Sequence, residues 1–272
     1  MAINDITLAG GMRSNLINLQ QVSTLQARTT QRLSTGKRVN SAIDDPSAYF
    51  AAQNEMSRAD DLATRKASMG EAIQTVKAGL QGIDGITNLI QQAQGLAASA
   101  RSASTADRSA LATQFDALRA QINQLASDSG YKGTNFLAAN SSLVVNFNES
   151  NTSNLTISGF DASTAGLGIS ASANAWVADT DIDGAVNNLN SALSTLRTKA
   201  QTLSSSNGVV TARQDFTTNM INTLTTGADQ LTAADPNEES ANMLALQTRQ
   251  QLGIVALQLS SQAQQSVMRL FG

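Results

Sequence analysis

Cysteine and histidine are both absent from the 272 residues. Without cysteine there is no disulfide framework and no thiol chemistry, and without histidine the commonest metal ligand and general base is missing. The sequence also has no glycine-rich phosphate loop and no metal-ligand spacing, so nothing in it would activate a nucleophile. We therefore expect no enzymatic activity, no cofactor and no metal site.

Aromatic residues and charge are also scarce. Aromatics make up 4% of the chain, and the formal net charge is −3. Few aromatics favour thin helical packing, and the dispersed Lys and Arg leave no basic patch for nucleic acid or an acidic membrane. No run of 18 apolar residues and no signal-peptide pattern appears. We expect no nucleic-acid binding, no membrane insertion and, if the protein leaves the cell, export without a cleaved signal.

Apolar residues recur at helical spacing through most of the chain. Residues 6–33 have this spacing with no charge from Ser14 to Ala27. Residues 47–100 carry a heptad seam that predicts one long, rod-like helix. A capping box at Ser104 and Asp107 predicts the start of a third helix that packs beside the second.

The heptad pattern is interrupted once and then returns. Residues 131–179 contain two alternating segments, 143–147 and 155–160, which predict a β-hairpin. From Ile182 the heptad resumes, and we interpret the Ser-rich residues 204–208 as a stutter within one long helix, with a break between two helices as the alternative. Beyond the stutter we place four residues on the seam: Phe216, Met220, Leu224 and Leu231.

Two joints separate the long helices, one near each end of the chain. In the first, residues 34–46, a glycine stops one helix by taking positive φ and an Asp-Pro pair starts the next. The second joint repeats the Asp-Pro signal. We expect the joints to cross together as a two-stranded spoke with eight residues: Arg32, Gly36, Lys37, Arg38, Asp45, Pro46, Asp235 and Pro236.

The last helix resembles the first in character. Residues 250–268 contain no charge, and the apolar stripe of this helix is too broad for one partner helix to cover. We expect the terminal helices to pair antiparallel and to keep apolar surface for assembly. The expected polymer-core residues are Leu16, Leu19, Val22, Leu25, Leu244, Leu252, Val255, Leu259, Val267 and Leu270.

These patterns together predict a mainly α protein. Its fold is an elongated antiparallel coiled-coil helical bundle with a small β-hairpin, in which the terminal helices form an inner two-helix module. Residues 1–33 and 235–272 would be the two parts of the inner module and residues 34–46 the spoke linker. Residues 47–234 would be the outer coiled-coil domain, with hairpin and loops at about 131–180.

One acidic segment offers a candidate metal site. Residues 179–184, DTDIDG, match the first half of a calcium loop, but its twelfth position is Asn190 instead of a bidentate Glu. The same aspartates are also typical of a helix N-terminus, where negative side chains interact favourably with the helix dipole. We therefore assign no metal to this segment.

The joint and the last helix carry motifs that resemble the bacterial flagellins. Residues 31–42, followed by Asp44 and Asp45, are similar to the N-terminal signature of that family. Parts of residues 239–271 are similar to its C-terminal signature. The resemblance covers roughly residues 1–137 and 182–272 and is closest in style to short alphaproteobacterial flagellins that lack large outer domains.

The resemblance implies a structural subunit of the bacterial flagellar filament, which self-assembles into a helical propeller for motility. It further implies an extracellular location, unfolded export through the flagellar type III apparatus with a chaperone, and growth under a filament cap next to hook-associated proteins. Because flagellins are often modified, Ser150, Thr152 and Ser153 are candidates for O-glycosylation.

Two alternatives remain open at this point. The hook-filament junction protein shares the terminal signatures, and self-seeding into long filaments would separate it from a filament subunit. A secreted coiled-coil adhesin or translocator would instead act as a monomer or small oligomer. Light scattering at rising concentration distinguishes that class, because only a polymer predicts seeded, open-ended growth.

Overall fold

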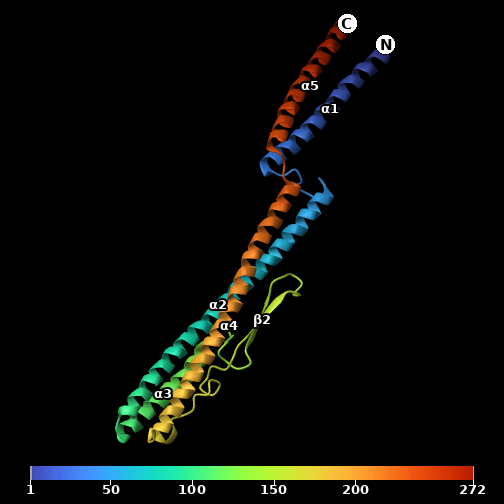
Figure 1. The fold of residues 1–272 in the computed structure, drawn as a ribbon. Coiled ribbons are helices and arrows are strands. Elements are labelled where there is room, and N and C mark those ends of the chain that lie inside the picture. Colours follow the sequence, from blue (N-terminus) through green and yellow to red (C-terminus); the bar gives the residue numbers. More distant parts are fainter. Residues whose placement is uncertain (1, 272) are drawn as a thin grey trace. The chain divides into compact units, whose positions relative to one another are not determined.

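The computed structural model describes the backbone of residues 2–271 and the side chains of residues 10–263, 265, 266 and 269. The expected core residues Val267 and Leu270 thus lie outside the described side chains. The fold is mainly α, as predicted (Figure 1). Its elements are α1 (Ala2–Thr35), α2 (Pro46–Ser102), α3 (Thr105–Asp128), β1 (Ser142–Asn146), β2 (Asn154–Ser158), the 3-10 turn η1 (Ala173–Trp176), α4 (Asp179–Thr232) and α5 (Pro236–Phe271).

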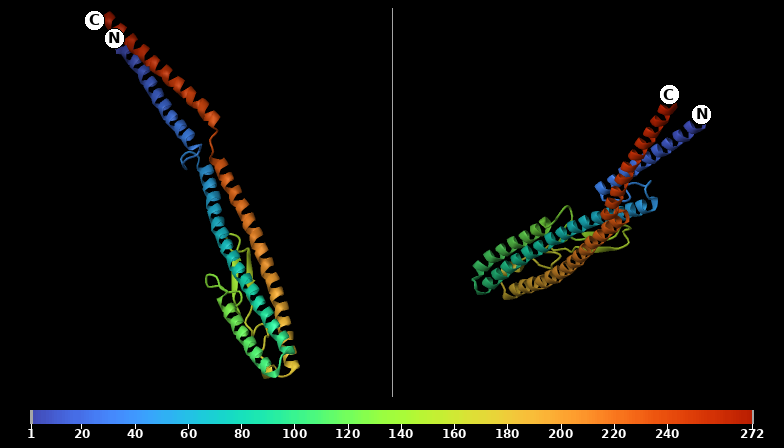
Figure 2. Two further views of the ribbon diagram at one scale, coloured as in Figure 1. Left: turned by 90° about the vertical axis from the view of Figure 1, so that its left-hand side faces the viewer. Right: turned by 90° about the horizontal axis from the view of Figure 1, so that it is seen from above.

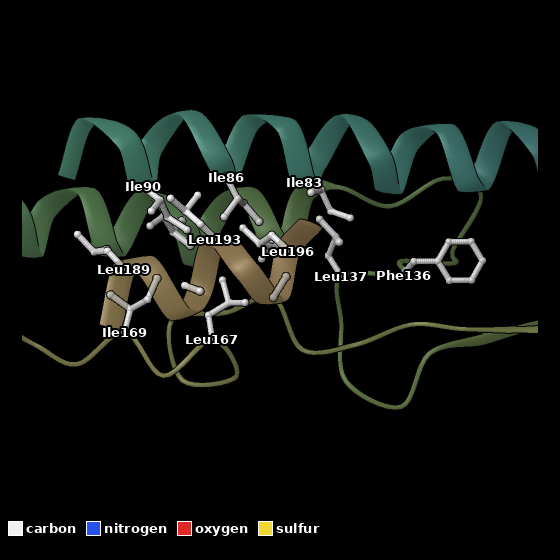
Figure 3. Packing of buried hydrophobic residues seen from close by; sticks show 14 of the residues in the cluster. Ile83, Ile86, Ile90, Phe136, Leu137, Leu167, Ile169, Leu189, Leu193 and Leu196 are labelled. Carbon is white, nitrogen blue, oxygen red and sulfur yellow. The ribbon is translucent and has the colours of Figure 1, made fainter. Parts of the chain in front are cut away.

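The chain divides into two units. The central unit is Arg58–Asn222, and the terminal unit combines Met1–Ser57 with Thr223–Gly272. In the central unit α2, α3 and α4 pack along their lengths around one apolar core (Figures 1 and 2). Figure 3 shows the middle of this core, where isoleucines of α2 lie against leucines of α4. These residues are Ile83, Ile86, Ile90, Leu189, Leu193 and Leu196.

Helix α4 is continuous through residues 204–208, so the prediction of one long helix is confirmed. The predicted stutter is wrong, because buried residues follow one another every seven positions across it: Ile182, Leu189, Leu196, Leu203, Val210 and Thr217. Phe216, which we placed on the seam, is 56% exposed. Thr217 takes the seam position instead, and its hydroxyl donates to the carbonyl of Arg213 at 2.8 Å, which satisfies this buried polar group.

The predicted β-hairpin is confirmed. β1 and β2 pair antiparallel with Val144 opposite Thr156. Ser104 caps α3 as predicted, because its Oγ accepts a hydrogen bond from the backbone N–H of Asp107 at 3.3 Å. The Asp107 carboxylate accepts from the Ser104 hydroxyl at 2.6 Å and not from the Ser104 backbone N–H, so the predicted capping box is only half formed. The turn η1 was not predicted, and its last residue, Trp176, is fully buried with its ring centroid 5.0 Å from that of Phe115.

In the terminal unit α1 and α5 lie side by side and run antiparallel (Figures 1 and 2). This pairing was predicted. The helices approach closely at Gly253, where an added methyl group would lie 2.6 Å from Cδ2 of Leu19. Glycine therefore makes room for a leucine side chain of the opposite helix.

Candidate assembly surface and joint

The two joints are hydrogen-bonded to each other. α1 ends at Thr35, and Gly36 follows with a φ of +67°, a conformation that glycine adopts without strain. The backbone N–H of Arg38 donates to the carbonyl of Thr232 at 2.7 Å, and that of Ala234 donates to the carbonyl of Gly36 at 2.9 Å. The turn after α1 thereby joins the chain between α4 and α5.

The two Asp-Pro pairs cap helices in the same way. Pro46 and Pro236 are the first residues of α2 and α5, where a residue without an N–H costs no hydrogen bond. Asp45 Oδ1 accepts from the N–H of Ala48 at 3.0 Å, and Asp235 Oδ1 accepts from the N–H of Asn237 at 2.8 Å. Both carboxylates thus satisfy helix N–H groups that otherwise lack a partner.

Charged side chains fix the base of the terminal helix pair. Arg32 on α1 contacts Glu239 on α5 at 2.8 Å, and the Glu239 side chain is only 6% exposed. Sequence reasoning placed Arg32 in the joint but missed this partner, since no local signal links residues 207 positions apart. Lys37 is exposed, and Arg38 lies 3.9 Å from Asp45.

A second acidic residue organises the turn of the first joint. Asp44 accepts hydrogen bonds from the N–H of Asn40 and from the N–H and hydroxyl of Ser41, and its other oxygen contacts Arg28 at 3.0 Å. The hydrogen bond from Asn40 is the largest of the effects that hold the pKa of Asp44 below its usual value. Sequence reasoning used Asp44 only as part of a family motif.

The paired terminal helices leave large aliphatic side chains in solvent. Of the expected core residues, Leu19 and Val22 are half-buried, whereas five others are more than half exposed: Leu16, Leu244, Leu252, Val255 and Leu259. Leu25 is 47% exposed, and Ile17 and Ile254, which are not among the expected core residues, are similarly exposed. A groove of about 420 Å³ is lined in part by Leu19, Val22, Leu25 and Leu252. We call the exposed side chains of α1 and α5 at six positions the apolar face: Leu16, Leu25, Leu244, Leu252, Val255 and Leu259.

The described residues contain no group of three or more acidic side chains that could hold a metal ion. In the calcium-like segment, Asp179 pairs with Arg108 at 2.8 Å and Asp183 pairs with Arg101. No helix in the described part of the chain is long and apolar enough to cross a membrane.

The hairpin loop holds the three candidate modification sites. Ser150 and Thr152 are exposed and Ser153 is half-buried. The side-chain amide of Asn148 donates to the hydroxyls of Ser150 at 3.0 Å and Thr152 at 2.7 Å. Its carbonyl oxygen accepts from the N–H of Ser153 at 3.1 Å, so one amide orders all three residues.

Comparison with known proteins matches both parts of the chain to one family. Residues 3–142 match the bacterial flagellin N-terminal helical region, and residues 180–271 match the C-terminal helical region. Flagellin FljM of Caulobacter vibrioides is 30% identical, with 100% of both chains covered. The flagellin of Brucella melitensis is 28% identical over 89% of this chain and 90% of that protein. A crystal structure of Bacillus cereus flagellin matches with a TM-score of 0.48 and 15% identity, over 55% of this chain and 88% of that one.

Proposed function

The chain belongs to the bacterial flagellin family, and we propose that its apolar face is the surface through which copies polymerise. The protein is a structural subunit of the flagellar filament, an extracellular polymer that self-assembles and acts as the propeller for motility. One observation carries the proposal: five large aliphatic side chains of α1 and α5 are more than half exposed although the two helices already pack against each other.

The domain roles follow from the same proposal. Residues 1–33 and 235–272 form the filament core, residues 34–46 form a spoke, and residues 47–234 form the outer domain. The hydrogen bonds between the turn after Gly36 and the chain near Ala234 support a spoke of two strands, because they tie both joints into one element.

The exposure of the apolar face sets the energy that assembly can gain. Complete burial of a Val or Leu side chain stabilises by about 1.5–3 kcal/mol. With roughly half of each of the six side chains still to be buried, the face offers on the order of 5–10 kcal/mol. Association itself costs about 4–15 kcal/mol, so contact with a single neighbour is marginal. Growth is expected where a subunit meets several neighbours at once, as at the end of a seed.

Seeded growth tests this proposal. Purified monomer is mixed with short filament seeds, and filament length is followed by electron microscopy. Deletion of residues 252–272 should abolish growth, and the double variant Leu252→Ser and Leu259→Ser should do so without shortening the chain. Val144→Ser changes a residue that is 53% exposed on β1, outside the apolar face, and should grow normally. Normal growth of the double serine variant would refute the proposed surface.

Family membership supports further partners for this chain. We infer export through the flagellar type III apparatus with a chaperone, and growth beneath a filament cap next to hook-associated proteins. The exposed hydroxyls of Ser150 and Thr152, with Ser153 beside them, are the candidate positions for O-linked sugars. An intact mass of purified filaments equal to that of the bare chain would exclude the sugars.

A further inference from the structure

The first joint presents one aliphatic side chain almost entirely to solvent. Ile43 is 94% exposed, the highest value among the exposed large apolar side chains that the structure describes. It lies in a turn closed by a hydrogen bond from the N–H of Asp44 to the carbonyl of Ser41 at 3.1 Å. Turns of this kind favour polar residues, glycine or proline, so the turn itself gives no reason for isoleucine.

The turn is held rigidly around Ile43. The carboxylate of Asp44 accepts hydrogen bonds from Asn40, Ser41 and Arg28, at donor–acceptor distances between 3.0 and 3.2 Å. A side chain carried by such a turn keeps its outward direction and loses little conformational freedom when it is buried by a partner. Ile43 is therefore preorganised as a projecting contact.

The same terminal unit contains an open pocket, here called the joint pocket, which is lined by residues of the first joint and by the neighbouring ends of α2 and α4. Its volume is about 130 Å³. Its lining includes the buried residues Val39, Ala52, Ala228 and Thr232, together with Tyr49 and Met56 at less buried positions. At about 30 Å³ per water-sized group, this volume takes at least four non-hydrogen atoms. An isoleucine side chain has four carbons and would contact the apolar part of this lining. The lining also contains Lys37, Asn40, Gln53 and Asp229.

We propose that Ile43 of one copy inserts into the joint pocket of a neighbouring copy in the filament. The proposal rests on the polymerisation proposed above and adds a contact outside the apolar face. A second copy is the occupant because the protein polymerises with itself and every copy carries both the projecting residue and the pocket. Two different, complementary patches on one subunit make a heterologous contact, and such contacts allow open-ended growth.

Crosslinking tests the contact directly, because the chain has no cysteine of its own. Copies with Ile43→Cys are copolymerised with copies that carry Gln53→Cys, a residue that lines the joint pocket, and the filaments are treated with a short bismaleimide. We expect at least ten times more crosslinked dimer than with Ser47→Cys in place of Gln53→Cys. Ser47 is exposed on α2 six residues before Gln53 but does not line the pocket.

Assembly measurements supply the second readout. Ile43→Asp should raise the monomer concentration left in equilibrium with seeds at least tenfold, whereas Ile43→Val should stay within about twofold of the wild type. Because Ile43 is exposed, neither change should alter the circular dichroism of the monomer. Normal filaments with equal crosslinking at positions 47 and 53, or normal growth of Ile43→Asp, would overturn the contact and leave the apolar face unaffected. Failure of wild-type monomer to grow from seeds would overturn both proposals.

Discussion

Alanine substitutions at two glycines of α2 should have opposite effects on the central unit. Gly82 and Gly95 both lie inside this helix, where alanine is favoured over glycine by about 1 kcal/mol. A methyl group at Gly95 would meet no atom within 4 Å. At Gly82 it would lie 2.3 Å from the Ser129 Oγ, 2.5 Å from Cδ1 of Leu137 and 2.6 Å from the Ser129 Cβ. We predict that Gly95→Ala stabilises and that Gly82→Ala destabilises.

The loss of stability in Gly82→Ala depends on whether Ser129 and Leu137 can move away from the added methyl group. Leu137 is 1% exposed and packed in the core, so its side chain has no free space to enter. Ser129 Oγ donates to the carbonyl of Leu125 at 2.6 Å, a hydrogen bond worth about 1 kcal/mol that a displaced hydroxyl would lose. Overpacking adds about 1–3 kcal/mol. After subtraction of the helix-propensity gain, the net loss is about 1–3 kcal/mol.

The fluorescence of Trp176 measures this effect in the central unit, because it is the only tryptophan and is fully buried there. Each 1 kcal/mol should move the thermal midpoint by about 2–4 °C. Gly95→Ala should therefore raise it by about 2–4 °C and Gly82→Ala should lower it. Adding Ser129→Ala should not rescue Gly82→Ala, because the Ser129 Cβ is itself too close. Midpoints that move in the same direction for both glycine variants would refute the reasoning.

Three further predictions concern the joint and one acidic side chain. Gly36→Val should cost about 1–2 kcal/mol through its positive φ alone, since an added Cβ meets no atom, and should alter filament curvature in electron micrographs. Arg32→Met should leave the Glu239 carboxylate buried without its partner and lower the stability of the terminal unit by about 3 kcal/mol. Faster hydrogen exchange in α5 would measure this loss, and adding Glu239→Gln should restore part of the lost stability. Burial would raise the pKa of Asp116, but hydrogen bonds from Ser172 and Arg119 outweigh it and lower the pKa. Because its pKa is lowered in the folded state, the ionised Asp116 carboxylate stabilises the fold above about pH 4, and this stabilisation is lost as pH falls. Asp116→Asn should therefore flatten the acid dependence of Trp176 fluorescence.

Local signals in the sequence predicted the helix boundaries well. The capping residue Ser104 and the pairs Asp45-Pro46 and Asp235-Pro236 act within one turn of the chain, so their effect can be inferred from neighbouring letters. Heptad spacing likewise predicted the seam of α2 and most of that of α4. Each of these inferences needs only residues that are close in sequence.

Tertiary context decided the features that sequence reasoning missed. Phe216 was placed on the seam of α4 for its large apolar side chain, yet the smaller Thr217 lies there because the seven-residue spacing continues unchanged. The pair of Arg32 with Glu239 depends on how two distant helices meet. The sequence around Ile43 gives no sign that this residue is unusual, and only the structure shows that nothing in the described chain covers its side chain.

The scarcity of charge in the terminal helices has a direct consequence for assembly. Residues 14–27 and 250–268 contain no ionisable side chain, so burial between copies removes no ion from water, a step that costs several kcal/mol per ion. Their polar groups are mostly hydroxyls and amides, and some hydroxyls, such as that of Thr24, already donate to the carbonyl one helical turn earlier. A gain of on the order of 5–10 kcal/mol from aliphatic burial would be cancelled by two unpaired buried charges. A single Lys introduced at Val255 should therefore impair seeded growth more than Ser at the same position, because it adds the cost of an ion to the loss of apolar area.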